Sequence, residues 1–134
     1  MPQVNPDNDG ADVANEVADF RQLLNNAQGI IICTAEYAHG VPGTLKNAID
    51  WTISSSQISH KLTMLITAST DGSFGHKALL ETLEAIEAKN IDNLQLVISF
   101  AKKKSIMKIQ SLMKEHFVNC RLYLQNSSLS LIHI

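Results

Sequence analysis

Two hydrophobic patterns alternate along the chain. Within residues 12–26, apolar side chains recur at three- and four-residue steps, as expected for one face of an amphipathic helix: Val13, Val17, Phe20 and Leu24. Residues 29–35, GIIICTA, are instead a short, continuously apolar run rich in β-branched residues, bounded by glycine and a polar loop. Such a run predicts a strand that is buried on both faces of a sheet.

Further strand and helix patterns follow the first pair. One helical face from residue 44 to about residue 55 carries small or apolar side chains: Leu45, Ala48, Ile49, Thr52 and Ile53. Residues 61–69, KLTMLITAS, predict a second buried strand, which leads into a polar, glycine-containing loop at residues 69–75. Helical spacing then extends up to Asn90 through Leu79, Leu80, Leu83 and Ile86. A third strand is predicted at residues 94–100, and a last helix carries Ile106, Ile109, Leu112, Met113 and Phe117.

Strands that alternate with helices of this length predict an α/β fold with a parallel sheet. We expect core strands near residues 30–34, 62–68 and 94–100, with helices on both faces. Residues 1–134 are expected to form a single domain, with an irregular leader at residues 1–11. The tail at residues 118–134 fits one or two strands, and its pattern leaves its structure open. Ligands of parallel sheets bind beyond the carboxyl ends of the strands, where both polar loops fall.

Composition and charge narrow the classes of partner. The chain has 134 residues, 45% of them hydrophobic and 18% charged, which is a globular composition. A formal net charge of −2 gives no long-range attraction for nucleic acid, and the basic run at residues 102–104 fits a solvated surface. No apolar run approaches the roughly 20 residues of a membrane span, and no signal peptide is evident. We therefore predict a cytoplasmic protein without nucleic-acid or membrane partners.

Several common site motifs are absent from the sequence. Neither the phosphate loop GxxxxGK[ST], the dinucleotide fingerprint GxGxxG nor the nucleophile motif GxSxG occurs. The five histidines and the two cysteines, Cys33 and Cys120, show no metal-ligand spacing, so no metal site is predicted. The remaining candidate for chemistry is the segment TAEYAHGVPGTLKNAIDW at residues 34–51, directly after the first predicted strand.

This segment resembles the second flavin loop of the NADPH-dependent FMN reductase family, which is approximately T-P-E-Y-N-x-x-x-P-G-x-L-K-N-A-x-D-W. The matching positions are Thr34, Glu36, Tyr37, Pro42, Gly43, Leu45, Lys46, Asn47, Ala48, Asp50 and Trp51. ITASTDGSFGHKALLETLEAI, at residues 66–86, is similar to the family's third flavin loop, and NPDND near the start is similar to its leader. The departures are Ala35, Ala38 and the pair His39 and Gly40. The resemblance covers about residues 3–104.

The resemblance implies a flavodoxin-like three-layer sandwich and hydride transfer from NADPH or NADH, through bound FMN, to a small electron acceptor. A quinone, an azo compound, a metal species or a similar molecule would accept the electrons. The cofactor-binding residues that it implies are Ala35, Glu36, Tyr37, Ala38, His39, Ser69, Thr70 and Gly72. The main chain of residues 35–38 would lie along the flavin ring, and no catalytic acid or base is required. His39 is expected on the substrate side of the site or as an exposed turn residue. Lys46, Asp50 and Trp51 are assigned to helix packing or to a subunit interface.

The family's first strand and its loop, roughly G-S-x-R-x-x-S-x-N, have no counterpart here, which predicts an N-terminally truncated sandwich. That loop binds the flavin phosphate in the family, so we expect any FMN binding to be weak and ring-centred, with similar affinities for FMN and riboflavin. The strand at residues 30–34 would lack a neighbour, which predicts a homo-oligomer. The alternative function is a non-catalytic remnant or interaction module of the same fold that holds no flavin.

Overall fold

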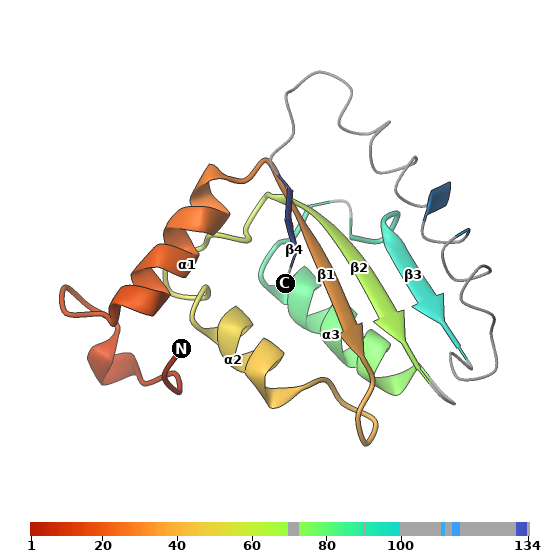
Figure 1. Cartoon of the computed structure of the whole chain (residues 1–134), viewed down its shortest axis with the longest axis horizontal. Helices are drawn as coiled ribbons and strands as arrows, with labels where there is room; N and C mark the ends of the chain where they lie inside the picture. Colours follow the sequence, from red (N-terminus) through yellow and green to blue (C-terminus); the bar gives the residue numbers. More distant parts are fainter. Residues whose placement is uncertain (70–72, 90, 100–110, 112–113, 116–130, 134) are drawn as a thin grey trace.

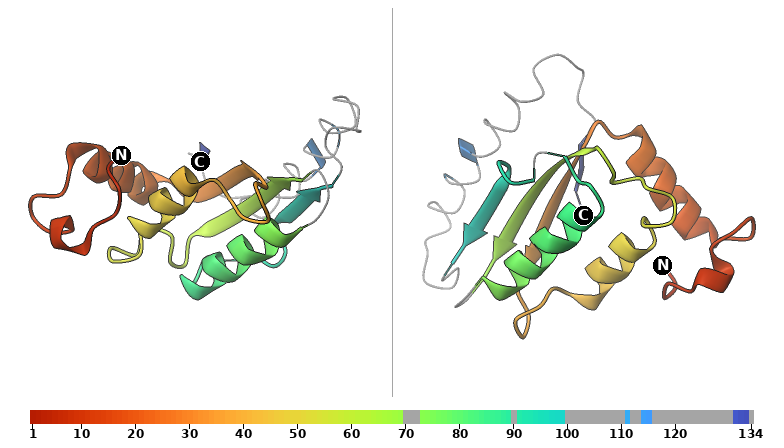
Figure 2. Two further views of the ribbon diagram at one scale, coloured as in Figure 1. Left: turned by 90° about the horizontal axis from the view of Figure 1, so that it is seen from below. Right: turned by 180° about the vertical axis from the view of Figure 1, so that it is seen from behind.

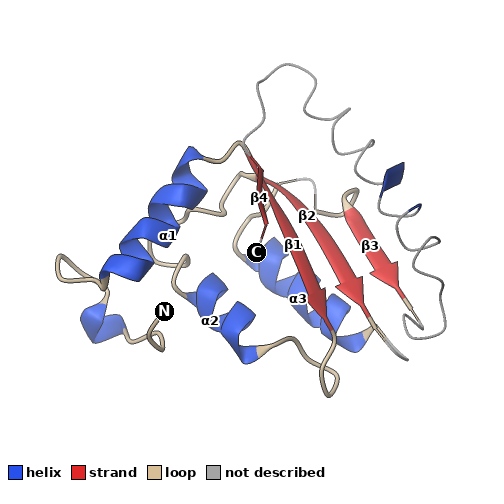
Figure 3. Cartoon of the chain, in the orientation of Figure 1, coloured by secondary structure: helices blue, strands red, loops and turns tan. Residues whose placement is uncertain are grey.

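The computed structural model describes residues 1–69, 73–89, 91–99, 111, 114–115 and 131–133. Its helices are η1 (Pro6–Asn8), α1 (Asn15–Asn26), α2 (Gly43–Asp50) and α3 (Phe74–Ala85). Its strands are β1 (Gly29–Ala35), β2 (Leu62–Ala68), β3 (Gln95–Ile98) and β4 (Leu131–His133), as Figure 3 shows. The last predicted helix, at residues 106–117, and most of the tail lie outside the described residues. The single-domain prediction for residues 1–134 therefore stays a prediction.

The described strands form one parallel sheet in the order β3-β2-β1-β4. β1 pairs with β2 along its whole length, from Gly29 opposite Leu62 to Ala35 opposite Ala68. The α/β class and the three parallel core strands are confirmed, although β3 is shorter than the predicted run at residues 94–100. The expected lack of a neighbour beside β1 is wrong for part of that strand, because β4 pairs with residues 29–31.

Both faces of the sheet are buried, as the continuous apolar runs predict. On one face, Ile30, Ile32 and Leu65 join a core cluster to which α1, α2 and α3 all contribute, for example through Leu24 of α1. Figures 1 and 2 show α3 lying across this face, with α2 beside it. On the opposite face, three side chains are each only 1% exposed: Ile31, Met64 and Ile66. Burying a side chain of this size contributes about 1.5–3 kcal/mol.

The helix expected to extend up to Asn90 ends earlier, at Ala85. Glu87 takes a left-handed conformation with φ 61°, and its amide donates to Glu84 O at 2.9 Å. The amide of Ala88 donates to Leu83 O, also at 2.9 Å. These two bonds form a Schellman motif, which satisfies the last carbonyls of the helix and turns the chain toward β3. A glutamate occupies the position that glycine usually takes, so the sequence contains no local signal for the end of this helix.

The helix predicted at residues 44–55 also ends early, at Asp50. Leu45, Ala48 and Ile49 are buried as expected, but Ile53 is 52% exposed because it lies in the turns that follow the helix. Trp51 is only 1% exposed and is a core residue.

The leader is tied to the end of α2 by hydrogen bonds. Asn47 accepts a bond from the amide of Val4 and donates one to Pro2 O, each at 2.8 Å. The indole Nε1–H of Trp51 also donates to Pro2 O, at 2.9 Å. Asn47 and Trp51, two of the family-motif residues, therefore hold the leader against α2. For Trp51 this agrees with the expected role in helix packing.

An ion pair extends the same attachment to α1. Nε of Arg21 donates a hydrogen bond to Trp51 O at 2.8 Å. Nη2 of Arg21 forms an ion pair with Asp9 Oδ1 at 2.7 Å. Its guanidinium lies 5.7 Å from the centroid of the Trp51 ring. The leader, α1 and α2 are thus joined around one buried tryptophan.

Candidate functional site

A tight hairpin turn follows β1 directly. The amide of Tyr37 donates to Gly40 O at 2.9 Å, and the amide of Gly40 donates to Tyr37 O at 2.8 Å. The two central residues, Ala38 and His39, both have positive φ, 47° and 61°. This is the geometry of a type I′ turn, which usually contains Asn-Gly because side chains other than these are strained there. An Ala-His pair therefore holds the turn at an energetic cost of about 1–2 kcal/mol per residue.

Glu36 fastens this hairpin to the start of α3. Its side chain is 7% exposed, and Oε2 accepts a hydrogen bond from the amide of Gly75 at 3.0 Å. A carboxylate is favourable here because the amides of a helix N-terminus have no partner within the helix. The two backbones meet so closely that a Cβ on Gly75 would lie 2.5 Å from Gly40 O. The loop after β1 and the helix that follows β2 therefore form one rigid unit.

Three exposed ring side chains lie on this unit. His39 packs edge-on against Phe74, with ring centroids 4.5 Å apart and an interplanar angle of 78°. The side chain of His39 is 70% exposed, Phe74 is 59% exposed and Tyr37 is 64% exposed. Nδ1 of His39 also lies 3.7 Å from Glu36 Oε1, which attracts the imidazole when it is protonated.

The predicted site residues that the structure describes gather at the carboxyl ends of β1 and β2. Ala35 ends β1, and the amide of Glu36 donates to Ala68 O at 2.9 Å. Ser69 follows β2, is 2% exposed, and donates from its amide to Ile98 O at 3.0 Å. Thr70 and Gly72 lie outside the described residues.

These bonds narrow the expected main-chain contacts with a flavin. The amides of Glu36 and Tyr37 already have protein acceptors. Among the described residues, the amides of Ala38 and His39 have no hydrogen-bond acceptor. Of residues 36–39, these two at the tip of the turn are the ones that can donate to a ligand.

A cavity of about 300 Å³ lies beside this loop, between β1 and the start of α2. Cys33 and Thr34 line it from the strand, and Pro42, Thr44, Leu45 and Ala48 line it from the helix side. Partial burial raises the pKa of the Cys33 thiol, although the side chain keeps exposed surface. The volume is at the lower end of the range for small-molecule sites, so the cavity can take part of a ligand.

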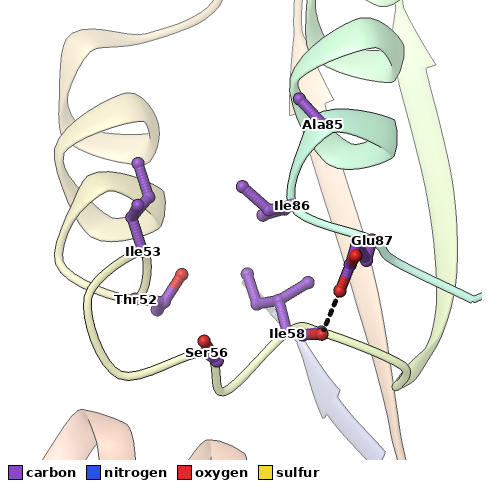
Figure 4. Close-up of a pocket in the computed structure, with 8 residues that line it drawn as sticks. Thr52, Ile53, Ser56, Ile58, Ala85, Ile86 and Glu87 are labelled. Atoms are coloured by element: carbon purple, nitrogen blue, oxygen red, sulfur yellow. Dashed lines mark hydrogen bonds between the residues drawn. The ribbon is translucent and has the colours of Figure 1, made fainter.

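A second cavity, of about 190 Å³, lies at the opposite end of the sheet (Figure 4). The turns before β2 contribute Thr52, Ile53, Ser56, Ile58 and Ser59, and the end of α3 contributes Ala85, Ile86 and Glu87. Ser59 Oγ donates to Glu87 Oε2 at 3.0 Å across it. Because this cavity adjoins the amino end of β2, it is separate from the two polar loops.

His76 is a structural histidine. It is 3% exposed, with Nδ1 2.9 Å from Thr67 Oγ1 and Nε2 2.9 Å from Gln95 Oε1. Within the part of the chain that the structure describes, no group of three or more His, Cys, Asp and Glu side chains is placed to hold a metal ion. In that same part, no helix is long and apolar enough to cross a membrane.

Sequence reasoning did not identify Phe74 or Gly75 as site residues. Both belong to the second polar loop, but their importance depends on contacts with residues 36–40. A glycine at a helix start and an exposed aromatic residue are common in any sequence, so no local signal distinguishes them.

Solved structures and curated proteins resemble this chain. FerB, a flavoenzyme NAD(P)H:(acceptor) oxidoreductase from Paracoccus denitrificans, superposes with a TM-score of 0.59 at 20% identity. This match covers 78% of the present chain and 56% of FerB, and shows that the fold is flavodoxin-like.

Curated relatives match over shorter segments. The NADPH azoreductase of Bacillus sp. (strain OY1-2) is 36% identical over 63 residues, which are 47% of this chain and 35% of the relative. The NADH:(hydroxy)cinnamate reductase subunit CrdA of Vibrio ruber is 34% identical over 67 residues, or 50% and 33% of the two chains. The quinone reductase of Escherichia coli (strain K12) is 49% identical over 35 residues, or 26% and 19%. The chain thus matches about a third or less of the length of these relatives.

The parallel sheet, with polar residues at the carboxyl ends of β1 and β2, defines a flavodoxin-like protein. The model of the NADPH-dependent FMN reductase family matches residues 1–103, which include both loops. The chain belongs to this family.

Proposed function

We propose that this chain acts as an NAD(P)H-dependent flavin oxidoreductase that uses FMN to reduce a small acceptor. The observation that carries the proposal is the bond between Glu36 and Gly75, which joins the turn after β1 to the start of α3. Both loops fall within the family match. A rigid surface suits a cofactor enzyme, because the protein's task is to bind and orient the reactive ring.

The residues present fit a flavin ring. The turn presents the adjacent amides of Ala38 and His39, and a flavin ring carries carbonyl and imine acceptors along its edge. Gly40 adds no side chain beside these amides, and the rings of Tyr37, His39 and Phe74 are exposed. Bound FMN would supply two-electron redox chemistry, while the chain binds the ring and holds acceptor and reductant against it.

Relatives suggest the class of acceptor. The names of three relatives specify an azo compound, a (hydroxy)cinnamate and a quinone, which are conjugated organic molecules. We propose this class for the present chain, ahead of metal species. We propose NADPH as the reductant, because the family is named for it, with NADH as the alternative. A cytoplasmic location and a homo-oligomer remain predictions from the sequence.

Purified protein mixed with FMN tests this proposal. We expect the fluorescence of FMN to change in an equilibrium titration with the protein, and NADPH or NADH to reduce ferricyanide catalytically when FMN is in excess. Titrations with FMN and riboflavin measure the contribution of the phosphate, which we expect to be small. If no flavin binds and no reduction occurs, the non-catalytic interaction module becomes the better description.

A further inference from the structure

The strained turn at residues 37–40 places the His39 ring against α3. Its two left-handed residues bring the His39 ring into contact with Phe74, which belongs to α3. Strain in a non-glycine turn persists only where other contacts hold it, and it concentrates at functional sites. Here the Glu36–Gly75 bond holds the turn.

The contact leaves ring surface available on both partners. Packed edge-on, the two rings do not cover one another, and they remain 70% and 59% exposed. The two rings in contact form one exposed apolar surface, which is a candidate binding site for another ring. Leu23 on α1 is also an exposed apolar residue, but it belongs to no ring–ring contact among the described residues.

We propose that His39 and Phe74 form a ring-binding platform that selects planar, conjugated acceptors such as quinones and azo compounds. This inference rests on the proposed function and names the substrate class of the same site. Aromatic rings attract one another in stacked or edge-to-face arrangements by about 0.5–1.5 kcal/mol beyond area burial. An acceptor without a conjugated ring gains nothing from the platform, so the platform confers selectivity.

Steady-state kinetics of the FMN-loaded protein separate the acceptors. Phe74→Ala should raise the KM for menadione, a planar naphthoquinone, by about two- to tenfold, which corresponds to the loss of one aromatic contact. The KM for ferricyanide, which has no ring, should stay unchanged. Leu23→Ala is the matched control, because it also truncates an exposed apolar side chain, and it should alter neither value.

Two further variants distinguish ring chemistry from bulk. Phe74→Tyr keeps an aromatic ring and should restore the menadione KM, whereas Phe74→Leu keeps apolar bulk without a ring and should not. If leucine restores the KM as well as tyrosine, the platform is merely hydrophobic and the proposal is wrong. If the variants raise the KM for NADPH and leave that for menadione unchanged, the platform serves the nicotinamide ring, which also overturns the assignment to the acceptor.

A binding measurement keeps this test independent of turnover. Wild-type protein that reduces no acceptor, ferricyanide included, would contradict the proposed function. Menadione titrated into isotope-labelled protein should still shift the His39 ring signals in NMR spectra, and Phe74→Ala should weaken that shift. Absence of a His39 shift in the wild type would overturn the platform itself.

Discussion

At the scale of single residues, Glu36 and Gly75 are the clearest examples of side-chain choice in the site. The carboxylate of Glu36 is buried, and the Gly75 amide is its hydrogen-bond donor. Gly75 needs no special φ, because the structure has no glycine at positive φ among its described residues. It is required for space, since Gly40 O occupies the position that a side chain would need.

Gly75→Ala should therefore destabilise the protein by about 1–3 kcal/mol, the usual effect of inserting an atom into a closely packed contact. Urea unfolding monitored by fluorescence measures the change. Gly43→Ala is the control, because nothing lies within 4 Å of a Cβ at Gly43 and alanine favours a helix. Equal effects of the two substitutions would mean that the loops are not in close contact.

Asp9 shows how one side chain links stability to pH. Its hydrogen bond from Ser54, followed by the hydrogen bond from Arg21, lowers the pKa of the Asp9 carboxyl. A carboxyl whose pKa is lower in the folded state stabilises the fold at pH values above its unfolded pKa. That stabilisation is lost as the pH falls through the folded pKa.

Asp9→Asn should lower the melting temperature at neutral pH, and the difference from wild type should shrink as the pH falls to about 3. Calorimetry across this range provides the measurement. Asp19→Asn, which changes an exposed aspartate of α1, is the control and should show a smaller, flatter difference. A pH-independent difference for Asp9→Asn would contradict the linkage.

At the scale of elements, the hairpin after β1 combines a strained turn with a fixed position. Ala38 has φ 47°, where asparagine is accommodated more easily than alanine. The turn therefore lowers the stability of the fold while it positions the His39 ring.

Ala38→Asn should stabilise the protein by up to about 1 kcal/mol, because it relieves part of this strain. Thermal unfolding measures the shift. The same substitution at Ala18, in the middle of α1, should destabilise by about 0.5 kcal/mol, because asparagine is a poorer helix former than alanine. If Ala38→Asn is as destabilising as Ala18→Asn, the turn is not type I′ in solution.

The second feature at the scale of elements is the hydrogen bonding of the leader, residues 1–11, to Asn47 of α2. Asn47 is 8% exposed and satisfies backbone groups of Pro2 and Val4 at once. Asn47→Ala leaves the Val4 amide without its acceptor, whereas Pro2 O keeps the bond from Trp51. The unpaired amide should lower the free energy of unfolding by about 1–3 kcal/mol. Hydrogen exchange should show loss of protection at the Val4 amide. Gln22→Ala, at an exposed position of α1, should leave this amide protected.

At the scale of the whole molecule, β1 has an incompletely paired edge. β4 covers residues 29–31 of β1, and residues 32–35 have no strand partner on that side among the described residues. Partly open edges favour pairing with another chain. Ile53, which is 52% exposed, supplies additional apolar surface.

We therefore still expect a homo-oligomer, although the open edge is shorter than the sequence suggested. Light scattering at micromolar concentration should give a mass that is a multiple of the 14.7 kDa chain. Ile53→Glu should lower that mass if this side chain is buried between copies. A monomer with no binding of a hydrophobic dye would contradict the expectation.

Local sequence determined the class of fold and the segment in which the candidate site is predicted. Continuous apolar runs require burial on both faces, so β1 and β2 were predicted within a residue, and parallel order follows from the alternating helices. The motif at residues 34–51 resembles the family's flavin loop. It can be recognised from the sequence because it lies in one continuous segment and has the family's spacing.

Only the tertiary structure decided which residues build the site. The type I′ turn at Ala38 and His39, the close approach of Gly40 to Gly75 and the His39–Phe74 contact all join segments distant in the sequence or depend on backbone strain. Propensity describes one residue in an average environment, so it cannot anticipate a conformation that distant contacts enforce. The pairing of β4 with β1 has the same cause, because about a hundred residues separate the two strands and their register depends on the whole sheet.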